Sequence, residues 1–326
     1  MFEQELERAV KKIKESVSFL LTCHVGPDAD ALGSVLAMGL ALKEIGKNVD
    51  WYNQDGSPSS LSFLPYVHQV KNSLELSKNY DVVITGDSGD IERLGKKFLG
   101  YKNYKCLINV DHHLTNTEFG DINVIDINAP STGAVMLEII KKLPVKVTAD
   151  IAKAVYVTLV TDTGSFQYRN TTKEAFELAG EMVGLGANPG DISEELYFSF
   201  PPAKVLLLKR VLDTLEFALD QRYASIVLHE KDLKEVNASR EVAEDFIDLP
   251  RSIKPVRVAA FFKEISKNKY KLSLRSKNKD VDVSKICGYF GGGGHYSASG
   301  CTLEGSLDKV KKEVFEQVQK ALIPKK

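Results

Sequence analysis

The sequence predicts a two-domain α/β protein: an N-terminal domain built on a parallel sheet with helices on both faces, then a smaller C-terminal α/β domain. Length is the first indication, because single cores rarely grow beyond about 250–300 residues and this chain has 326. The second is the alternation of apolar runs with helical patterns in the first half, which is typical of parallel sheets. A glycine-rich stretch at residues 184–190 marks the seam between the domains.

The first domain should begin with a charged amphipathic helix over residues 1–17 rather than a signal peptide. Apolar runs predict buried strands at residues 17–24, 49–53, 80–85 and 105–110, with a further buried apolar stretch at residues 151–160. Helices are predicted over residues 31–46, closed by a glycine, and over residues 131–142.

We place the first domain at residues 1–186, a helical connector at 187–220 and the second domain at 221–326. One or two helices interrupted by Pro201 and Pro202 should span residues 192–218. The second domain should hold a strand at 223–229, a hairpin formed by 256–263 and 269–275, a glycine run at 291–294 and an amphipathic helix at 307–322.

Composition is ordinary for a soluble globular protein, with 43% hydrophobic and 27% charged residues. No apolar run approaches the roughly 20 residues that cross a bilayer. The four cysteines are Cys23, Cys106, Cys287 and Cys301. They lack CxxC spacing, which argues against a zinc site and favours a cytoplasmic location.

Charge is distributed unevenly along the chain. Residues 251–326 contain 17 Lys and Arg against 7 Asp and Glu, a net charge of +10, and the remainder carries −11. An acidic first part and a basic last part can separate metal binding from polyanion binding. A lysine-rich solvated surface explains the basic part equally well.

Four of the apolar runs end in residues that bind metals. The six side chains are His24, Asp28, Asp30, Asp87, His112 and Asp162, with Asp111 and His113 beside them. Functional groups gather at the carboxyl ends of parallel strands. A single Asp there would be an ordinary helix N-cap, but six Asp and His side chains on four ends are too many for capping.

So many carboxylates raise one another's pKa unless cations neutralise them. Oxygen and imidazole ligands without thiolates favour Mn²⁺, with Mg²⁺, iron or Co²⁺ as weaker candidates. Two such ions about 3.5–4 Å apart stabilise both the attacking and the leaving oxygen of a phosphoryl transfer. The sequence therefore predicts phosphoester hydrolysis.

The motifs that carry these residues resemble those of one family. HVGPDADALGS (24–34), ITGDSGDIERLG (84–95), NVDHHLTN (109–116) and VTDTGSF (160–166) are similar, in order, to the four motifs of the DHH phosphoesterases. LSLRSK (272–277) and GGGGHYSASGC (291–301) resemble the DHHA1 domain of the same family. The resemblance implies an active site in a cleft between the two domains.

The resemblance also implies roles for single residues. His24, Asp28 and Asp87 would bind one Mn²⁺, and Asp30, Asp87, His112 and Asp162 the other, so that Asp87 bridges the two. His113 would act beside the scissile phosphate, and Asp111 would orient a histidine. Asp87, Asp111 and His113 are thus the expected catalytic residues.

Substrate binding is expected in the second domain. Four glycines let a backbone present N–H groups to an anion, and Arg275 suits bidentate phosphate recognition. By the family pattern, the nucleotide would contact Ser273, Arg275, Gly292, Gly293, Gly294 and His295. One departure is visible, because TDTGSF is often followed directly by Arg, whereas here Gln167 and Tyr168 precede Arg169. Arg169 is retained as a candidate phosphate ligand.

Chain length favours the compact members of the family over RecJ-type exonucleases, which carry further domains, and the GGGGH run argues against family II pyrophosphatases. What remains resembles the bifunctional oligoribonuclease/PAP phosphatases (nanoRNases) and the stand-alone cyclic di-AMP or pApA phosphodiesterases. Short RNA or dinucleotide substrates follow, rather than long nucleic acid or membranes. The first helix and the connector leave room for a homodimer.

Two other functions remain open. The same site fits a phosphatase acting on 3′-phosphoadenosine 5′-phosphate (pAp). A nucleotide sensor without catalytic activity is less favoured, because degenerate sensors usually lose metal ligands and none is missing here. Among pApA, cyclic di-AMP, short oligoribonucleotides and pAp, linear substrates with a free end fit a terminal anchor most simply.

Overall fold

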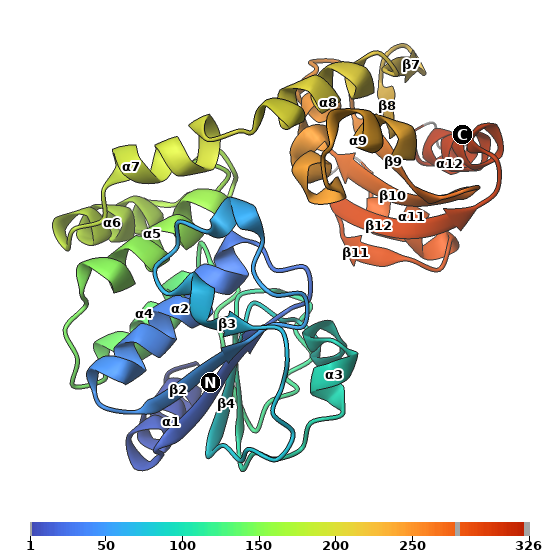
Figure 1. The fold of residues 1–326 in the computed structure, drawn as a ribbon. Helices are drawn as coiled ribbons and strands as arrows, with labels where there is room; N and C mark the ends of the chain where they lie inside the picture. Colours follow the sequence, from blue (N-terminus) through green and yellow to red (C-terminus); the bar gives the residue numbers. More distant parts are fainter. Residues whose placement is uncertain (1, 278–280, 323–326) are drawn as a thin grey trace. The chain divides into compact units, whose positions relative to one another are not determined.

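The structure, a computed structural model, describes residues 2–277 and 281–322, apart from the side chains of Glu241 and His295. The chain divides into two compact units, Met1–Ser199 and Phe200–Lys326, and each has its own six-stranded sheet (Figure 1). The predicted two-domain α/β fold is therefore confirmed. The division falls inside the segment predicted as a connector, residues 187–220.

The first unit is built on a parallel sheet with strand order β3-β2-β1-β4-β5-β6. Its strands are β1 (Ser18–Cys23), β2 (Asn48–Tyr52), β3 (Val70–Lys71), β4 (Val82–Gly86), β5 (Leu107–Asp111) and β6 (Ile122–Ile125). Because β1, β4 and β5 are buried on both faces, they are mostly apolar in the sequence. The four predicted strands are confirmed as β1, β2, β4 and β5, whereas β3 and β6 were not predicted.

Helices cover both faces of this sheet, as predicted. One face shares a core with α1 (Phe2–Glu15), α2 (Ala29–Glu44), α4 (Thr132–Lys141) and α5 (Ala149–Asp162). The other face packs against η3 (Ile91–Leu94) and α3 (Lys96–Leu99). The remaining elements are η1 (Ser59–Leu61), η2 (Val67–Gln69), α6 (Lys173–Gly184), α7 (Pro189–Ser193) and the π-helical turn η4 (Glu194–Phe198).

The apolar stretch at residues 151–160, which we grouped with the strand ends, is a helix. It forms most of α5, which packs against α2, α4 and α6. Apart from Lys153, every residue from 151 to 160 is buried, so no polar face gives the sequence a helical period. Asp162 consequently ends a helix, not a strand.

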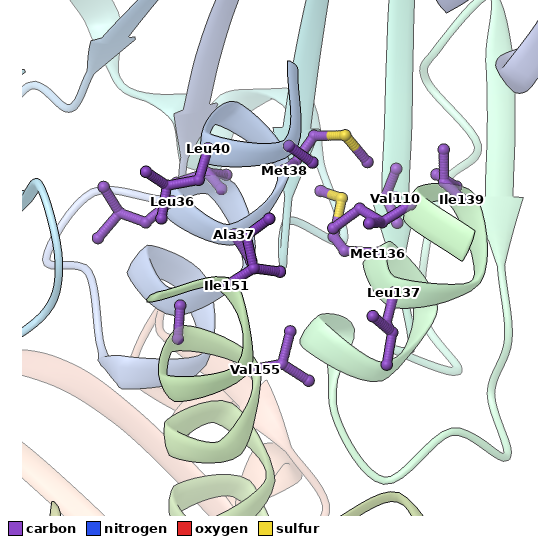
Figure 2. Packing of buried hydrophobic residues seen from close by; sticks show 14 of the residues in the cluster. Leu36, Ala37, Met38, Leu40, Val110, Met136, Leu137, Ile139, Ile151 and Val155 are labelled. Atoms are coloured by element: carbon purple, nitrogen blue, oxygen red, sulfur yellow. The ribbon is translucent and has the colours of Figure 1, made fainter. Parts of the chain in front are cut away.

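Thr158 of α5 marks the point where three helices meet. A Cβ added at Gly33 of α2 would lie 2.6 Å from Thr158 Cγ2, and one added at Gly133 of α4 would lie 2.0 Å from Thr158 Oγ1. The two glycines therefore let α2 and α4 approach α5 closely. Figure 2 shows the buried apolar side chains packed between these helices.

The second unit has a mixed sheet with order β11-β12-β10-β9-β8-β7, in which only β8 and β9 run parallel. Its strands are β7 (Glu216–Ala218), β8 (Tyr223–Leu228), β9 (Val258–Ser266), β10 (Lys269–Ser276), β11 (Gly293–His295) and β12 (Ala298–Glu304). The predicted strand at 223–229 and the hairpin are confirmed. Half of the glycine run forms β11, an edge strand.

The two faces of this sheet carry separate cores. One is formed with α8 (Pro202–Leu212), α9 (Glu230–Val236) and η5 (Arg240–Ile247), and the other with α11 (Val283–Tyr289) and α12 (Leu307–Leu322). The short α10 (Asp248–Ser252) completes the unit. Residues 192–218 are broken at Pro201 as predicted, but 216–218 form β7 because they pair with β8. None of the helices in the described residues is long and apolar enough to cross a membrane.

Gly33→Ala should lower the free energy of unfolding by roughly 1–3 kcal/mol, the usual cost of overpacking, because α2 and α5 must move apart. Gly180→Ala in α6 is the matched control. A Cβ there meets nothing within 4 Å, so helix propensity should raise stability by up to about 1 kcal/mol. Urea unfolding of both variants checks this, and a Gly33→Ala protein as stable as the parent would contradict the close approach.

Candidate metal centre

The candidate ligands lie where the order of the first sheet reverses. The chain moves outward from β1 to β2 and β3, then returns to place β4 on the other side of β1. This switch point opens a crevice at the carboxyl ends of the strands. His24 follows β1 and Asp87 follows β4, and His24 Nε2 lies 3.3 Å from Asp87 Oδ2.

His24, Asp28 and Asp87 form one group. His24 Nδ1 lies 2.9 Å from the carbonyl oxygen of Val25, which turns Nε2 toward the two carboxylates. Asn53 donates to the carbonyl oxygen of His24 at 2.8 Å. Asp28 caps α2 by accepting from the Ala31 N–H, and 66% of its side chain is exposed.

Asp30, His112 and Asp162 form a second group. His112 Nε2 lies 3.8 Å from Asp30 Oδ2 and 3.6 Å from Asp162 Oδ2. Its Nδ1 lies 3.1 Å from the carbonyl oxygen of Ala129, so again the outer nitrogen faces the carboxylates. Asp30 is buried and accepts from the N–H groups of Thr132 and Gly133, at the N-terminus of α4.

Asp87 joins the two groups. Its Oδ2 faces His24, and its Oδ1 lies 3.9 Å from His112 Nε2 and accepts from Thr132 Oγ1 at 3.0 Å. The backbone of Asp87 is left-handed, with φ of 56°, a conformation that Asp tolerates better than most residues. Its N–H donates to the carbonyl oxygen of Val110, which anchors this turn to the end of β5.

His113 is held by a chain of hydrogen bonds. Its Nδ1 lies 2.7 Å from Asp111 Oδ1 and 3.5 Å from Asp87 Oδ1. Asn116 donates to Asp111 Oδ2 at 2.6 Å, and Asp111 is fully buried. Asp111 therefore fixes the orientation of the His113 ring through Nδ1, and Asn116 in turn fixes Asp111.

The clustered charges shift several pKa values. Burial raises the pKa of Asp162 to about 6 against the opposing influence of His112. Burial and the nearby Asp87 raise the pKa of Asp30 well above its usual value. Burial alone would raise the pKa of Asp87. The hydrogen bond from His24 and the charges of His113 and His112 outweigh burial, so the pKa of Asp87 is lowered.

For His113, burial lowers the pKa, but the hydrogen bond and charge of Asp111 outweigh burial and raise it to about 9. Without a cation, this cluster therefore retains protons at neutral pH. Divalent cations would replace those protons by neutralising the carboxylates directly.

The donor set fits divalent cations. Within each group the ligand atoms lie within 4.8 Å of one another, and they are carboxylate oxygens and imidazole nitrogens, the ligands that Mn²⁺ and Mg²⁺ accept. A third group consists of Asp87, His112 and His113. All six predicted ligands thus meet at one edge of the sheet.

The predicted substrate-binding residues of the second unit lie at one end of its sheet. Ser273 and Arg275 alternate with the buried Leu272 and Leu274 along β10, and they pair across the sheet with Gly300 and Ala298 of β12. On the other side of β10, Ser273 and Arg275 pair with Phe261 and Ala259 of β9. Arg169, in the first unit, is exposed on the loop after α5.

The glycine run at residues 291–294 is needed for close packing within the second unit, whether or not it also contacts a ligand. The N–H groups of Gly291 and Gly292 donate to the carbonyl oxygens of Gly288 and Cys287, so they are already used within the chain. A Cβ at Gly292 would lie 2.4 Å from Cys301 Cβ, and Gly294 has φ of 142°. Gly293 and Gly294 lie in β11, and the side chain of His295 is outside the described residues.

Sequence reasoning missed the residues that hold the ligands in place. Thr132 and Asn170 contact Asp30, Asp87 and Asp162. Asn116 is the last residue of the NVDHHLTN motif, but sequence reasoning gave it no role. The available signal for Asn116 was a polar residue three positions after His113 in the same motif, but the contacts of Thr132 and Asn170 depend on how distant segments pack together.

Comparison with known proteins covers both units. Residues 18–159 match the N-terminal domain of the DHH family and residues 222–322 match the DHHA1 domain. The chain is 32% identical over 321 residues to the bifunctional oligoribonuclease and PAP phosphatase NrnA of Thermus thermophilus, covering 98% of this chain and 94% of that protein. It is 30% identical to the probable bifunctional oligoribonuclease and PAP phosphatase NrnA of Streptococcus mutans, with 89% and 90% covered.

Among solved structures, an exopolyphosphatase-related protein from Bacteroides fragilis is similar with a TM-score of 0.89 at 25% identity, covering 98% of this chain and 96% of that one. The resemblance inferred from the motifs is therefore confirmed. Five of the six candidate ligands lie inside the matched residues 18–159, and Asp162 lies just beyond them.

Mn²⁺ should stabilise the protein by mass action, by about 2.7 kcal/mol at one hundred times the dissociation constant. That corresponds to a rise of roughly 5–10 °C in the melting temperature for a unit of this size. Asp87→Asn should lose most of the rise, because both groups share Asp87. Thermal unfolding after EDTA treatment, with and without added Mn²⁺, checks this, and an unchanged melting temperature for the parent protein would argue against a metal centre.

Proposed function

We propose that this chain, which belongs to the DHH phosphoesterase family and carries its DHHA1 domain, is a metal-dependent phosphodiesterase that hydrolyses very short nucleotides to mononucleotides. The observation that carries the proposal is the set of three overlapping Asp/His groups, in which Asp87 and His112 each occur twice. pApA and short oligoribonucleotides are the first proposed substrates, cyclic di-AMP is another, and AMP is the product. Relatives named oligoribonuclease support this substrate class.

We assign His24, Asp28 and Asp87 to one Mn²⁺, and Asp30, Asp87, His112 and Asp162 to the other. The division comes from the family motifs. The groups His24/Asp28/Asp87 and Asp30/His112/Asp162 support it, and Asp87 lies 3.3 Å from His24 Nε2 and 3.9 Å from His112 Nε2. When bound, two divalent cations would lower the pKa of a water nucleophile and neutralise charge on the phosphoryl oxygens. Mg²⁺ or Co²⁺ are the proposed substitutes for Mn²⁺.

His113 is proposed to act on the substrate. It belongs to the third group, but its Nδ1 already lies 2.7 Å from Asp111 Oδ1. With Nδ1 held there, Nε2 is the nitrogen that would contact a phosphoryl oxygen or the leaving group. Against the opposing effect of burial, the hydrogen bond and the charge of Asp111 raise the pKa of His113, which favours the protonated imidazole that a proton donor requires.

The second unit is proposed to recognise the nucleotide. Arg275 would bind a phosphate through its planar guanidinium, and Ser273, on the same face of β10, would add a hydroxyl donor. Gly292, Gly293, Gly294 and His295 are proposed to line the same site, with the glycines allowing close approach of the ligand. Arg169 remains a proposed phosphate contact on the first unit.

Hydrolysis of pAp is the second candidate function, because the curated relatives are named PAP phosphatases as well. It would use the same metal ligands and differ in what the second unit binds. A sensor without catalytic activity is disfavoured, because all six candidate ligands are present and lie together.

Product analysis with Mn²⁺ tests the proposal, with pApA, cyclic di-AMP, a ribo-pentamer and pAp offered in parallel. AMP released fastest from pApA or the pentamer supports a phosphodiesterase for short nucleotides. Phosphate released from pAp alone makes the protein a phosphatase, and no turnover of any substrate would overturn both.

Asp87→Asn should reduce kcat by about 10²–10³-fold or more, as loss of a preorganised electrostatic group does. The control is Asp150→Asn, an exposed aspartate in the first turn of α5, at the opposite end from Asp162. It should retain parental kinetics. Steady-state hydrolysis of pApA measures both, and an active Asp87→Asn enzyme would sink the shared-ligand assignment.

Arg275→Ala should raise KM for pApA roughly 10–100-fold with little change in kcat, because it removes binding that is common to the ground state and the transition state. Lys269→Ala is the matched control on the same strand, where Lys269 pairs with Glu304 at 3.0 Å. It should leave KM unchanged. Equal kinetics for all three proteins would remove Arg275 from the substrate site.

A further inference from the structure

Asn170 contacts a candidate metal ligand, although the family motifs gave it no role. It is half-buried on the loop between α5 and α6. Its Nδ2 lies 3.0 Å from the carbonyl oxygen of Pro130, 3.1 Å from that of Asp162 and 3.2 Å from Asp162 Oδ2. An amide NH₂ has two hydrogens, so Asn170 can hold the Asp162 carboxylate and the turn before α4 at the same time.

That turn orients the other ligands of the same group. We call residues 129–133 the orienting segment. The carbonyl oxygen of Ala129 contacts His112 Nδ1, and the N–H groups of Thr132 and Gly133 donate to Asp30. Thr132 Oγ1 donates to Asp87. Asp162 is the one member of its group that reaches the orienting segment through an intermediary, and that intermediary is Asn170.

The loop after Asp162 turns back on itself, and this turn brings Asn170 next to Asp162. Gly164, Ser165 and Phe166 have φ values of 57°, 59° and 61°, a left-handed turn that costs non-glycine residues roughly 1–2 kcal/mol each. The turn is held by the Phe166 N–H, which donates to Thr163 Oγ1, and by Ser165 Oγ, which lies 2.6 Å from the Tyr197 hydroxyl. Strain of this kind persists where the surroundings over-determine it.

Asp162 needs such support more than Asp30 does. Its side chain is 35% exposed, against 3% for Asp30, and it stands at the end of a helix, where no following strand restrains it. The same oxygen, Oδ2, lies 3.6 Å from His112 Nε2 and accepts from Asn170. Asn170 therefore fixes the atom that faces the metal group.

We propose that Asn170 is a positioning residue that holds Asp162 in place for the metal bound by Asp30, His112 and Asp162, an inference that rests on the proposed two-metal function. It does not touch the substrate in this scheme. Its loss should free the Asp162 carboxylate without disturbing His24 and Asp28, whose contacts come from Val25, Asn53 and Ala31.

The experiment is a Mn²⁺ binding isotherm of the full chain by calorimetry, for the parent and for Asn170→Ala. Two sites are expected in the parent. In Asn170→Ala one site should weaken by about 10–100-fold, the usual effect of losing a residue that orients a ligand, and the other should keep its affinity. At saturating Mn²⁺, KM for pApA should match the parent, and kcat should recover with added Mn²⁺.

Asn170→Asp has nearly the same volume but no donor, and its carboxylate would face that of Asp162, so it should weaken the same site at least as much. Asn48→Ala, an exposed asparagine at the start of β2, is the matched control and should leave both sites unchanged. Melting of the metal-free proteins shows whether a variant has merely lost stability.

Each outcome decides the inference. Selective weakening of one site in both Asn170 variants supports it. Two unchanged sites, or equal weakening of both sites together with a lower melting temperature of the metal-free variant, overturns it and leaves the proposed function standing. A parent protein that binds no Mn²⁺ overturns the proposed function and this inference together.

Discussion

Mutual repulsion among Asp28, Asp30, Asp87 and Asp162 is the constraint around which the first unit is organised. Carboxylates gathered in a partly buried cluster disfavour one another's ionisation. Burial, and after it the neighbouring Asp87, raises the pKa of both Asp30 and Asp162. The chain offsets the repulsion with directed donors. Two N–H groups at the start of α4 face Asp30, and three histidines approach Asp87. The reversal of strand order between β1 and β4 brings His24 and Asp87 to one edge of the sheet.

The packing of α2, α4 and α5 transmits this constraint into the core. The same three helices carry Asp30, the N–H groups that hold it, and Asp162. Gly33 and Gly133 set their spacing against Thr158. A change of a few tenths of an ångström there would move the ends of the helices, because a close-packed interior transmits strain. The positions of Asp30 and Asp162 therefore depend on how these three helices pack in the core.

The strand ends were predictable because each apolar run is followed by a polar residue: His24, Asp87 or Asp111. Parallel strands end at the same edge of a sheet, so these residues were expected to lie together. The helical state of residues 151–160 was not predictable, because a helix buried on all sides has no polar stripe to reveal its period. The contacts of Thr132 and Asn170 arise from segments brought together only in three dimensions, and no local pattern encodes them. The assignment of ligands to two metals came from the family motifs, since spacing alone does not divide six donors.

The opposite charges of the two parts of the chain suggest why the proposed chemistry is divided between them. A cluster of four aspartates repels a phosphodiester until cations are bound, so substrate affinity cannot depend on the first unit alone. In the proposed scheme, residues 251–326, with a net charge of +10, would attract a nucleotide whether or not metal is present. Leu272 and Leu274 of β10 lie in the core and Arg275 alternates with them, so a one-residue slip of β10 would turn its charge toward that core. Binding in the proposed scheme therefore depends on strand register in one unit, and turnover depends on neutralised carboxylates in the other.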